Sequence, residues 1–162
     1  MGFLDKLLSK DKIEVGAPMR GSVVPLSEVS DPTFGQELLG KGVAIKPADG
    51  RVCAPCDGVV SAVFNTGHAL SVTSAKGGAE ILIHVGLDTV KLAGKHYTIH
   101  AKKGDTVKAG DLLVECDLDG IRADGYDTIT PVVICNIDEF RDFSAQTGME
   151  AQVGDTVATF AK

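Results

Sequence analysis

Short runs of valine and isoleucine, interrupted by polar residues, recur from residue 13 to the end of the chain. In two of them, HALSVTS (68–74) and AEILIHV (79–85), apolar and polar side chains alternate, which is typical of half-buried β-strands. Long helices are excluded from the first third of the chain by four prolines, Pro25, Pro32, Pro47 and Pro55. The pattern therefore predicts an all-β domain over residues 13–162.

These two strands form a hairpin in the centre of the chain. If Ser74 pairs with Gly78, the loop has three residues, and Gly77 takes the left-handed position that such loops favour. His68 then lies directly opposite His84, and directly opposed Cβ atoms are about 4.5–5.5 Å apart. A four-residue loop would shift the pairing by one residue and leave the two imidazoles offset but close. Both registers predict that these histidines are neighbours.

The first twelve residues follow a different pattern. Apolar residues recur at helical spacing, with lysines around them; they are Phe3, Leu4, Leu7 and Leu8, and Lys6, Lys10 and Lys12. We expect residues 1–12 to be a flexible, amphipathic segment that precedes the domain. It is either a frayed terminus or an amphipathic segment that binds weakly to an anionic membrane surface. Each lysine near such a surface contributes about 1 kcal/mol of binding free energy.

Two further local patterns carry predictions. Asn136 followed by Glu139 has the form of a capping box, which predicts a short helix over 137–143. The tetrapeptide Gly-Asp-Thr-Val occurs at 104–107 and again at 154–157, next to other turn residues. This weak internal repeat is typical of the corners in a sandwich of short hairpins.

Composition and charge exclude several classes of protein. Acidic residues outnumber basic ones by 22 to 16, giving a net charge of −6 without a basic cluster, so nucleic acid is not an expected partner. No apolar run approaches the roughly 20 residues of a membrane span. An acidic residue at position 5 and the lack of a long apolar core argue against a signal peptide. We therefore expect a cytoplasmic protein whose four cysteines are reduced.

The cysteines raise two chemical alternatives. Cys53-Ala-Pro-Cys56 has the spacing of a thiol redox motif, but that chemistry requires a helix starting at the first cysteine to lower its pKa. Here an Asp-Gly turn and a β-branched run follow, so we interpret both residues as packing and turn positions. A four-cysteine zinc site would require a second such pair, whereas Cys116 and Cys135 are isolated in the sequence.

The histidine pair carries the most informative chemistry. A neutral imidazole is a competent nucleophile near pH 7 and also a good leaving group, as a phosphoryl shuttle requires. Thr66 lies two residues before His68, hence on the same face, where its hydroxyl can fix the tautomer of that ring. His96 and His100 have no partner at ligand spacing and are interpreted as solvated or structural. An apolar rim that keeps water off a phosphohistidine is expected from four residues, Phe64, Leu70, Leu82 and Phe34.

Five motifs spread over nearly the whole chain carry a family resemblance. They are GVAIKPADGRVCAPCDGVV, TGHAL, ILIHVGLDTV, GDTVKAGDLL and TPVVICN. With them the chain resembles the glucose-type enzyme IIA (IIA-Glc) of the bacterial phosphoenolpyruvate-dependent sugar phosphotransferase system. The resemblance implies an antiparallel β-sandwich or barrel-sandwich hybrid (the duplicated hybrid motif) with very short helices. It implies that His84 receives a phosphoryl group from the phosphocarrier protein HPr and passes it to a cysteine of a sugar-specific IIB domain of an IICB permease, without a required cofactor.

The same resemblance implies roles for other residues. His68 matches the partner histidine, and Thr66 matches the hydroxyl that supports the pair. Asp88 matches the acidic residue beside the active histidine, and Asp31 one that faces HPr, whose docking face is positively charged and partly apolar. Regulated proteins such as glycerol kinase or sugar permeases are further implied partners. A carboxylate from such a partner would complete a zinc site on His68 and His84.

Two other classes of function are compatible with parts of the sequence. His84 and Asp88 have the spacing of a half-site in zinc-dependent LytM-like hydrolases, whose sandwich is related, although the His-x-His of those enzymes is missing. Gly-Asp-x-Val turns also occur in carriers of biotinyl or lipoyl groups. Such a carrier needs an exposed hairpin lysine between acidic or methionine neighbours, and no lysine here has that setting.

Overall fold

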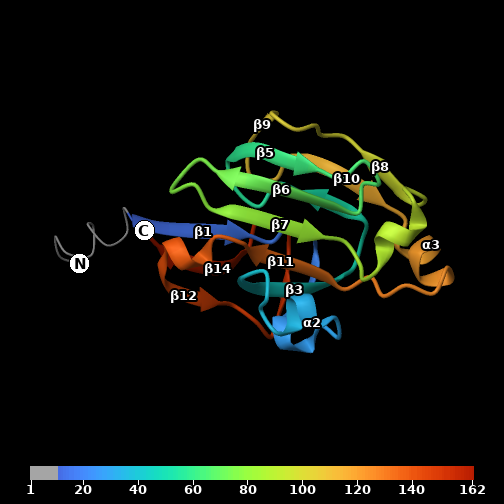
Figure 1. The fold of residues 1–162 in the computed structure, drawn as a ribbon, viewed down its shortest axis with the longest axis horizontal. Helices are drawn as coiled ribbons and strands as arrows, with labels where there is room; N and C mark the ends of the chain where they lie inside the picture. Colours follow the sequence, from blue (N-terminus) through green and yellow to red (C-terminus); the bar gives the residue numbers. More distant parts are fainter. Residues whose placement is uncertain (1–10) are drawn as a thin grey trace.

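The computed structural model describes residues 11–162, so the predicted amphipathic segment 1–12 lies outside the described residues except for its last two positions. The described chain consists of antiparallel strands with two short α-helices and three 3₁₀ turns (Figure 1). The predicted all-β fold with very short helices is therefore confirmed. Within residues 11–162, no helix is long and apolar enough to cross a membrane.

The elements follow one another closely along the chain. The strands are β1 (Lys12–Gly16), β2 (Gly21–Pro25), β3 (Lys41–Pro47), β4 (Arg51–Cys53), β5 (Gly58–Val63), β6 (Ala69–Ser74), β7 (Glu80–His84), β8 (Tyr97–Ile99), β9 (Thr106–Val107), β10 (Leu112–Cys116), β11 (Thr130–Ile134), β12 (Arg141–Ala145), β13 (Met149–Ala151) and β14 (Thr156–Ala161). The helical elements are η1 (Leu26–Glu28), α2 (Pro32–Gly35), η2 (Thr89–Leu92), α3 (Leu118–Ala123) and η3 (Ile137–Glu139).

The described strands pair into one large sheet and two small ones. The large sheet has the order β13-β2-β3-β11-β7-β6-β5-β9, and the small sheets have the orders β1-β14-β12 and β4-β10-β8. In Figure 1, β5, β6, β7, β11 and β3 follow one another down the molecule in the order of the large sheet. β1 pairs with β14, so the start and the end of the described chain lie side by side.

Three copies of one turn tie distant parts of the chain together. In each copy an aspartate carboxylate accepts a hydrogen bond from the backbone N–H three residues earlier, at 2.9 Å. The N–H of the glycine before the aspartate donates a hydrogen bond to the carbonyl of one distant residue. The N–H of that same residue donates to the aspartate carbonyl. These partners are Val60 for the turn at 102–105, Ala54 for that at 108–111 and Ala17 for that at 152–155. The repeat predicted at 104 and 154 thus marks corners of the fold, with a third copy between them.

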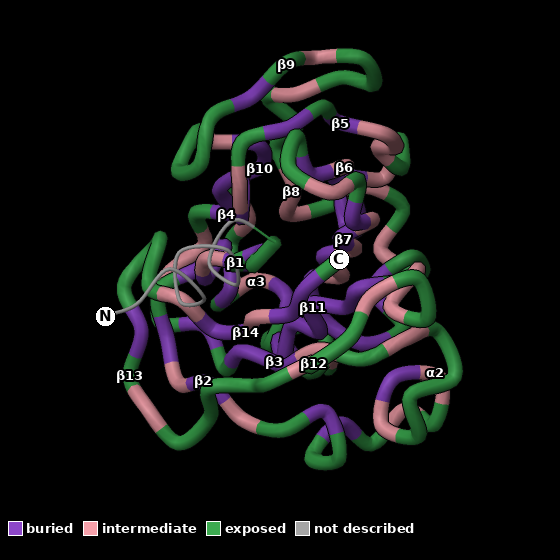
Figure 2. Tube along the Cα trace, turned by 90° about the vertical axis from the view of Figure 1, so that its left-hand side faces the viewer, coloured by how far each residue is buried: buried purple, intermediate pink, exposed green. Residues whose placement is uncertain are grey.

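Buried side chains form one main core and a smaller second cluster. The largest fully buried side chains of the main core include Phe160, Met19, Ile45, Leu70 and Ile81. In Figure 2 the buried stretches run through the central strands, among them β3, β7 and β11, and the peripheral turns are exposed. The second cluster lies under η1 and α2 and contains Leu26, Val29, Phe34, Ala44, Leu87, Ile129 and Val133.

β6 and β7 form the predicted hairpin, but the three-residue loop is wrong. Ala69, and not His68, pairs with His84, and the Ser74 N–H donates to the Ala79 carbonyl at 2.8 Å, so the loop has four residues. The Ser74 hydroxyl fixes this loop, because it donates to the Lys76 carbonyl at 2.7 Å and accepts from the Ala79 N–H at 2.8 Å. The offset register is the correct alternative.

The helix expected over 137–143 is also wrong. The chain makes the single turn η3 there and then enters β12, which pairs with β14. The Asn136 side chain does not cap a helix. It accepts a hydrogen bond from the Glu80 N–H at 2.9 Å and donates one to the Gly78 carbonyl at 3.0 Å, so it ties this segment to the hairpin.

Candidate active site

The start of β6 and the end of β7 bring the two predicted histidines together. The ring centroids of His68 and His84 are 5.0 Å apart, and their planes cross at 81°. The Val85 N–H donates to the His68 carbonyl at 2.7 Å, which joins the two segments just beyond the strand ladder. His68 is 2% exposed, whereas His84 is only partly buried. His84 is therefore the ring that a partner molecule can reach.

The protonation of the His84 ring follows from one contact. Its Nδ1 lies 2.7 Å from the carbonyl oxygen of Gly86. A carbonyl oxygen only accepts hydrogen bonds, so Nδ1 carries the proton, and in the neutral ring Nε2 has a free lone pair. Gly86 has a φ of +88°, and a Cβ there would lie 2.5 Å from Cγ2 of Thr89. This turn therefore requires glycine.

Thr66 and Phe64 lie against His68. The Oγ1 atom of Thr66 is 2.5 Å from Nδ1 of His68, within hydrogen-bond distance. The Phe64 ring meets the His68 ring edge-on, with centroids 5.2 Å apart, and Phe64 is 49% exposed. The structure thus places the Thr66 hydroxyl against the buried His68 ring and the Phe64 ring at the edge of the site.

Phe34 reaches His84 from α2. The sequence Ser-Asp-Pro-Thr starts this helix, because the Asp31 carboxylate accepts a hydrogen bond from the Thr33 N–H at 3.0 Å and Pro32 stands at the first helical position. The helix packs Phe34 into the second cluster and against His84, with ring centroids 5.0 Å apart. An aromatic ring therefore flanks each histidine.

Of the two leucines of the expected rim, Leu70 lies in the main core and Leu82 lies on the face of the site. Leu70 is 1% exposed and belongs to the main core, and it pairs with Ile83, which points to the same core. His84 pairs with Ala69 on the opposite face of the hairpin, so the structure does not bring Leu70 to the site. Leu82 is on the face of His84 and packs against the second cluster, which contains Phe34. Phe34 and Phe64 are the rim residues whose rings pack against the histidine rings.

Electrostatics keep both imidazoles neutral near pH 7. Burial lowers the pKa of His68 to about 4, and neighbouring His84 lowers it in the same direction. Burial also lowers the pKa of His84, an effect that the Gly86 carbonyl and the negative charges of Asp31 and Asp88 partly oppose. Asp88 is exposed and adopts a φ of +59° at the start of η2. The site therefore holds two neutral rings with acidic groups at its border.

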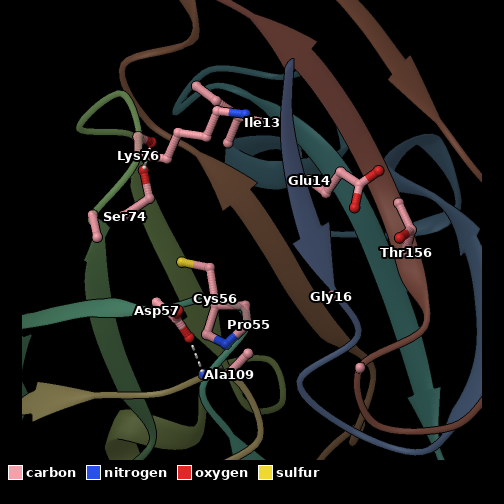
Figure 3. A pocket seen from close by; sticks show the side chains of 12 residues that line it. Ile13, Glu14, Gly16, Pro55, Cys56, Asp57, Ser74, Lys76, Ala109 and Thr156 are labelled. Atoms are coloured by element: carbon pink, nitrogen blue, oxygen red, sulfur yellow. Dashed lines mark hydrogen bonds between the residues drawn. The ribbon is translucent and has the colours of Figure 1, made fainter. Parts of the chain in front are cut away.

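The cysteines lie apart from this site. Burial raises the pKa of the Cys53 thiol, and it raises the pKa of Cys56 to about 11, which disfavours the thiolate that redox chemistry requires. Cys56 lines a cavity of about 360 Å³ between β1 and the far end of β6 (Figure 3). There the Asp57 carboxylate accepts a hydrogen bond from the Ala109 N–H at 2.9 Å. All four cysteines are free.

The other two histidines make local contacts with carboxylates. Nε2 of His96 is 2.8 Å from the Asp124 carboxylate, and Nε2 of His100 is 2.8 Å from Glu115. These contacts agree with a structural role. Among residues 11–162, no group of three or more histidine, cysteine, aspartate and glutamate side chains could hold a metal ion.

Sequence reasoning missed the groups that lie behind the histidines. The Gly86 carbonyl belongs to the backbone and leaves no sequence signal. Tyr97 and Thr89 both donate a hydrogen bond to the Val85 carbonyl, each at 2.8 Å. Neither residue follows from the alternation of the hairpin, because Tyr97 comes from another sheet and Thr89 from η2.

Comparisons with known proteins agree with this geometry. The family model of the phosphoenolpyruvate-dependent sugar phosphotransferase system, EIIA 1, matches residues 13–140. The glucose-specific EIIA component of Oceanobacillus iheyensis is 46% identical over 144 residues, which are 89% of this chain and 87% of that protein. The glucose permease IIA of Mycoplasma capricolum has the same fold, with a TM-score of 0.86 and 33% identity over 98% of this chain and 99% of the other.

A longer relative contains the same domain. The β-glucoside-specific EIIBCA component of Dickeya chrysanthemi is 50% identical over 125 residues, which are 77% of this chain but only 20% of that protein. The predicted phosphotransferase component with a phosphocarrier role in sugar uptake is confirmed, and nothing in these comparisons supports the LytM-like hydrolase. The chain belongs to the EIIA 1 family of the phosphoenolpyruvate-dependent sugar phosphotransferase system.

Proposed function

We propose that Nε2 of His84 accepts the phosphoryl group of phospho-HPr and passes it to the cysteine of a sugar-specific IIB domain. The observation that carries this proposal is the contact between Nδ1 of His84 and the Gly86 carbonyl. It leaves Nε2 as the nitrogen with a lone pair, on the more accessible of two neighbouring histidines. The family assignment supports the reaction class.

Both half-reactions are displacements at phosphorus. In the first, the Nε2 lone pair attacks the phosphorus while the bond to the HPr histidine breaks, and those electrons return to the HPr ring. In the second, the IIB thiolate attacks and the bond to Nε2 breaks. Such transition states are loose, so the protein contributes chiefly positioning and charge stabilisation. The aromatic rings of Phe34 and Phe64 keep water away from the labile phosphohistidine.

His68 supplies the donor that the phosphoryl oxygens need. If the Thr66 hydroxyl donates to Nδ1 of His68, the proton of that neutral ring is on Nε2. That N–H can then bond to a phosphoryl group on His84, whose ring centroid is 5.0 Å away. Because the pKa of His68 is about 4, this donor is neutral at pH 7, and its bond to the phosphate does not bury a positive charge.

Reconstitution of the transfer chain tests this function directly. The purified protein is incubated with phosphoenolpyruvate, enzyme I and HPr, and the phosphorylated residue is mapped. We expect one acid-labile phosphate per chain, on His84. Phosphate on another residue, or no uptake in the presence of active HPr, would contradict the proposal.

The class of permease follows from a second assay. The relatives include proteins named glucose-specific and β-glucoside-specific, so IIB domains of both classes are the candidate acceptors. Transfer from the phosphorylated chain to each purified IIB domain measures which one it serves. We propose that at least one of them accepts phosphate, and failure with both would contradict this assignment.

Asp31 and Asp88 are proposed to steer the encounter with HPr. Removing both charges as Asp31→Asn/Asp88→Asn should lower the association rate roughly three- to tenfold at low ionic strength and hardly at all near ~0.5 M salt, because screening removes long-range attraction. Asparagine retains the helix cap at 31 and tolerates the positive φ at 88. Stopped-flow association over a salt series measures the effect.

A matched control separates steering from net charge. Asp138→Asn/Glu139→Gln removes two exposed carboxylates at η3, beside the far end of the hairpin. This variant should associate with HPr nearly as fast as the natural chain. Equal losses in both double variants would mean that only the total charge matters, and an association rate indifferent to salt would overturn the steering role.

Zinc on the histidine pair stays a prediction that needs a partner molecule. Neutral imidazoles are good zinc ligands, but two of them leave the tetrahedral shell incomplete. Titration with Zn²⁺ of the isolated chain and its His68→Ala variant, with and without glycerol kinase, measures the requirement. We expect weak binding by the chain alone and stronger binding in the mixture. Tight binding by the isolated chain that survives loss of His68 would contradict the prediction.

A further inference from the structure

One side chain from a separate sheet contacts both histidine-bearing segments. Tyr97 is the first residue of β8, in the sheet β4-β10-β8. A Cβ placed on Gly67, the residue before His68, would lie 2.8 Å from Cβ of Tyr97, so β8 packs directly on that segment. The Tyr97 hydroxyl donates to the carbonyl of Val85, the residue after His84, at 2.8 Å. Tyr97 thus connects the segment that precedes His68 with the segment that follows His84.

The Val85 peptide groups link the two histidines. The Val85 N–H donates to the His68 carbonyl at 2.7 Å, and the Val85 carbonyl accepts from Tyr97 and from Thr89, each at 2.8 Å. β7 ends at His84, and the backbone beyond it is held by single hydrogen bonds, which include one from the Leu87 N–H to the Asp127 carbonyl at 3.0 Å. Val85 is 1% exposed and Thr89 is fully buried, which keeps water from replacing these donors.

The orientation of the Val85 carbonyl affects the position of the His84 ring, which is the proposed nucleophile. Val85 and Gly86 share a peptide plane, because the Val85 carbonyl carbon is bonded to the Gly86 nitrogen. A rotation of that plane moves Gly86, whose own carbonyl holds the proton on Nδ1 of His84. The Tyr97 hydroxyl is a permanent donor here, since burial raises the pKa of Tyr97 to about 12.

We infer that Tyr97 is a positioning residue for phosphoryl transfer: with Thr89 it holds the Val85 carbonyl, so that Gly86 keeps the His84 ring oriented with Nε2 toward the phosphoryl donor. The inference rests on the proposed function of His84. Tyr97 does not touch the reacting atoms, and its effect passes through the Val85–Gly86 peptide. The apolar part of Tyr97 and its hydroxyl have separate tasks, since its Cβ packs on the Gly67 segment, its side chain packs against the main core, and the hydroxyl fixes the peptide.

Tyr97→Phe removes only the hydroxyl and leaves the ring packing intact. Thr89 still donates to Val85, so the variant should fold with a melting temperature close to that of the natural chain. We expect the rate of uptake at saturating phospho-HPr to fall about three- to tenfold, with KM for phospho-HPr within about twofold, because docking is unchanged and alignment is not. Tyr126→Phe, which removes the other phenol hydroxyl of the chain, is the matched control and should leave the rate unchanged.

A second readout follows the His84 ring itself. The ¹⁵N shifts of the unphosphorylated protein report which ring nitrogen carries the proton. The natural chain should show His84 protonated on Nδ1, and Tyr97→Phe should show a measurable fraction of the other tautomer. This measurement needs no HPr, so it tests the positioning role even if the proposed transfer fails. An unchanged uptake rate, or a slower rate with an unchanged His84 tautomer, would overturn the inference.

Discussion

Replacing His84 by glutamine is expected to abolish uptake of phosphate from phospho-HPr, with a loss of at least about 1,000-fold. Glutamine is polar and similar in size, so the ring contacts with Phe34 and His68 are lost but no large cavity forms. Its amide nitrogen has no available lone pair and cannot attack phosphorus. Uptake is measured as acid-labile phosphate formed with enzyme I, HPr and phosphoenolpyruvate.

His100→Gln is the matched control, because it removes an exposed histidine whose ring bonds to Glu115, away from the site. It should take up phosphate at the natural rate. The pH dependence gives a second check, since only the neutral ring is a nucleophile. The pKa of His84 lies below its usual 6.5, so uptake should change little between pH 8 and about 7 and should fall in more acidic solution. Acid-labile phosphate on the His84→Gln chain would exclude this histidine as the acceptor.

Replacing His68 by glutamine should affect the two half-reactions unequally. Phosphate should still reach His84, because the nucleophile and its contact with the Gly86 carbonyl remain. Onward transfer to the IIB cysteine should slow about 100-fold, since the donor to the phosphoryl oxygens loses its fixed position beside Thr66 while charge redistributes in the transition state. Single-turnover transfer from HPr and to IIB, measured separately, gives both rate constants.

The same measurement includes a built-in comparison. A glutamine at 68 that merely distorted the hairpin would slow both half-reactions to a similar extent. Equal losses would therefore refute the division of labour between the histidines. The thermal stability of the variant should be compared as well, because His68 is 2% exposed and its replacement changes the packing beside Phe64.

The alternation of apolar and polar residues predicted β6 and β7 to within one residue, because burial of one face leaves a period of two in the sequence. The register could not be predicted in the same way. It depends on the loop, where the Ser74 hydroxyl bonds to Lys76 and Ala79 and favours four residues over three. The histidines are neighbours in either register, so the predicted histidine pair is correct although the predicted loop length is not.

Groups that act through the backbone or from another sheet had no comparable signal. Asn136 resembled a helix cap, but its side chain bonds to the hairpin backbone at Glu80 and Gly78 instead. Tyr97 reaches Val85 because β8 packs on the Gly67 segment, and a strand of three residues carries too little pattern to predict that placement. Asp31 and Asp117 cap α2 and α3, a position that aspartate favours, but these two short helices were not predicted from the sequence.

The pairing of β1 with β14 determines how the domain can be attached to other proteins. Lys12 pairs with Ala161, and the Lys162 side chain bonds to the Gly77 carbonyl at the tip of the β6–β7 hairpin. The histidines lie at the other end of that hairpin, about 17 Å away for the five residues of β7. A tether on either end of residues 11–162 would therefore leave from the side opposite His84, and the phosphoryl group could still be presented to two different proteins in turn.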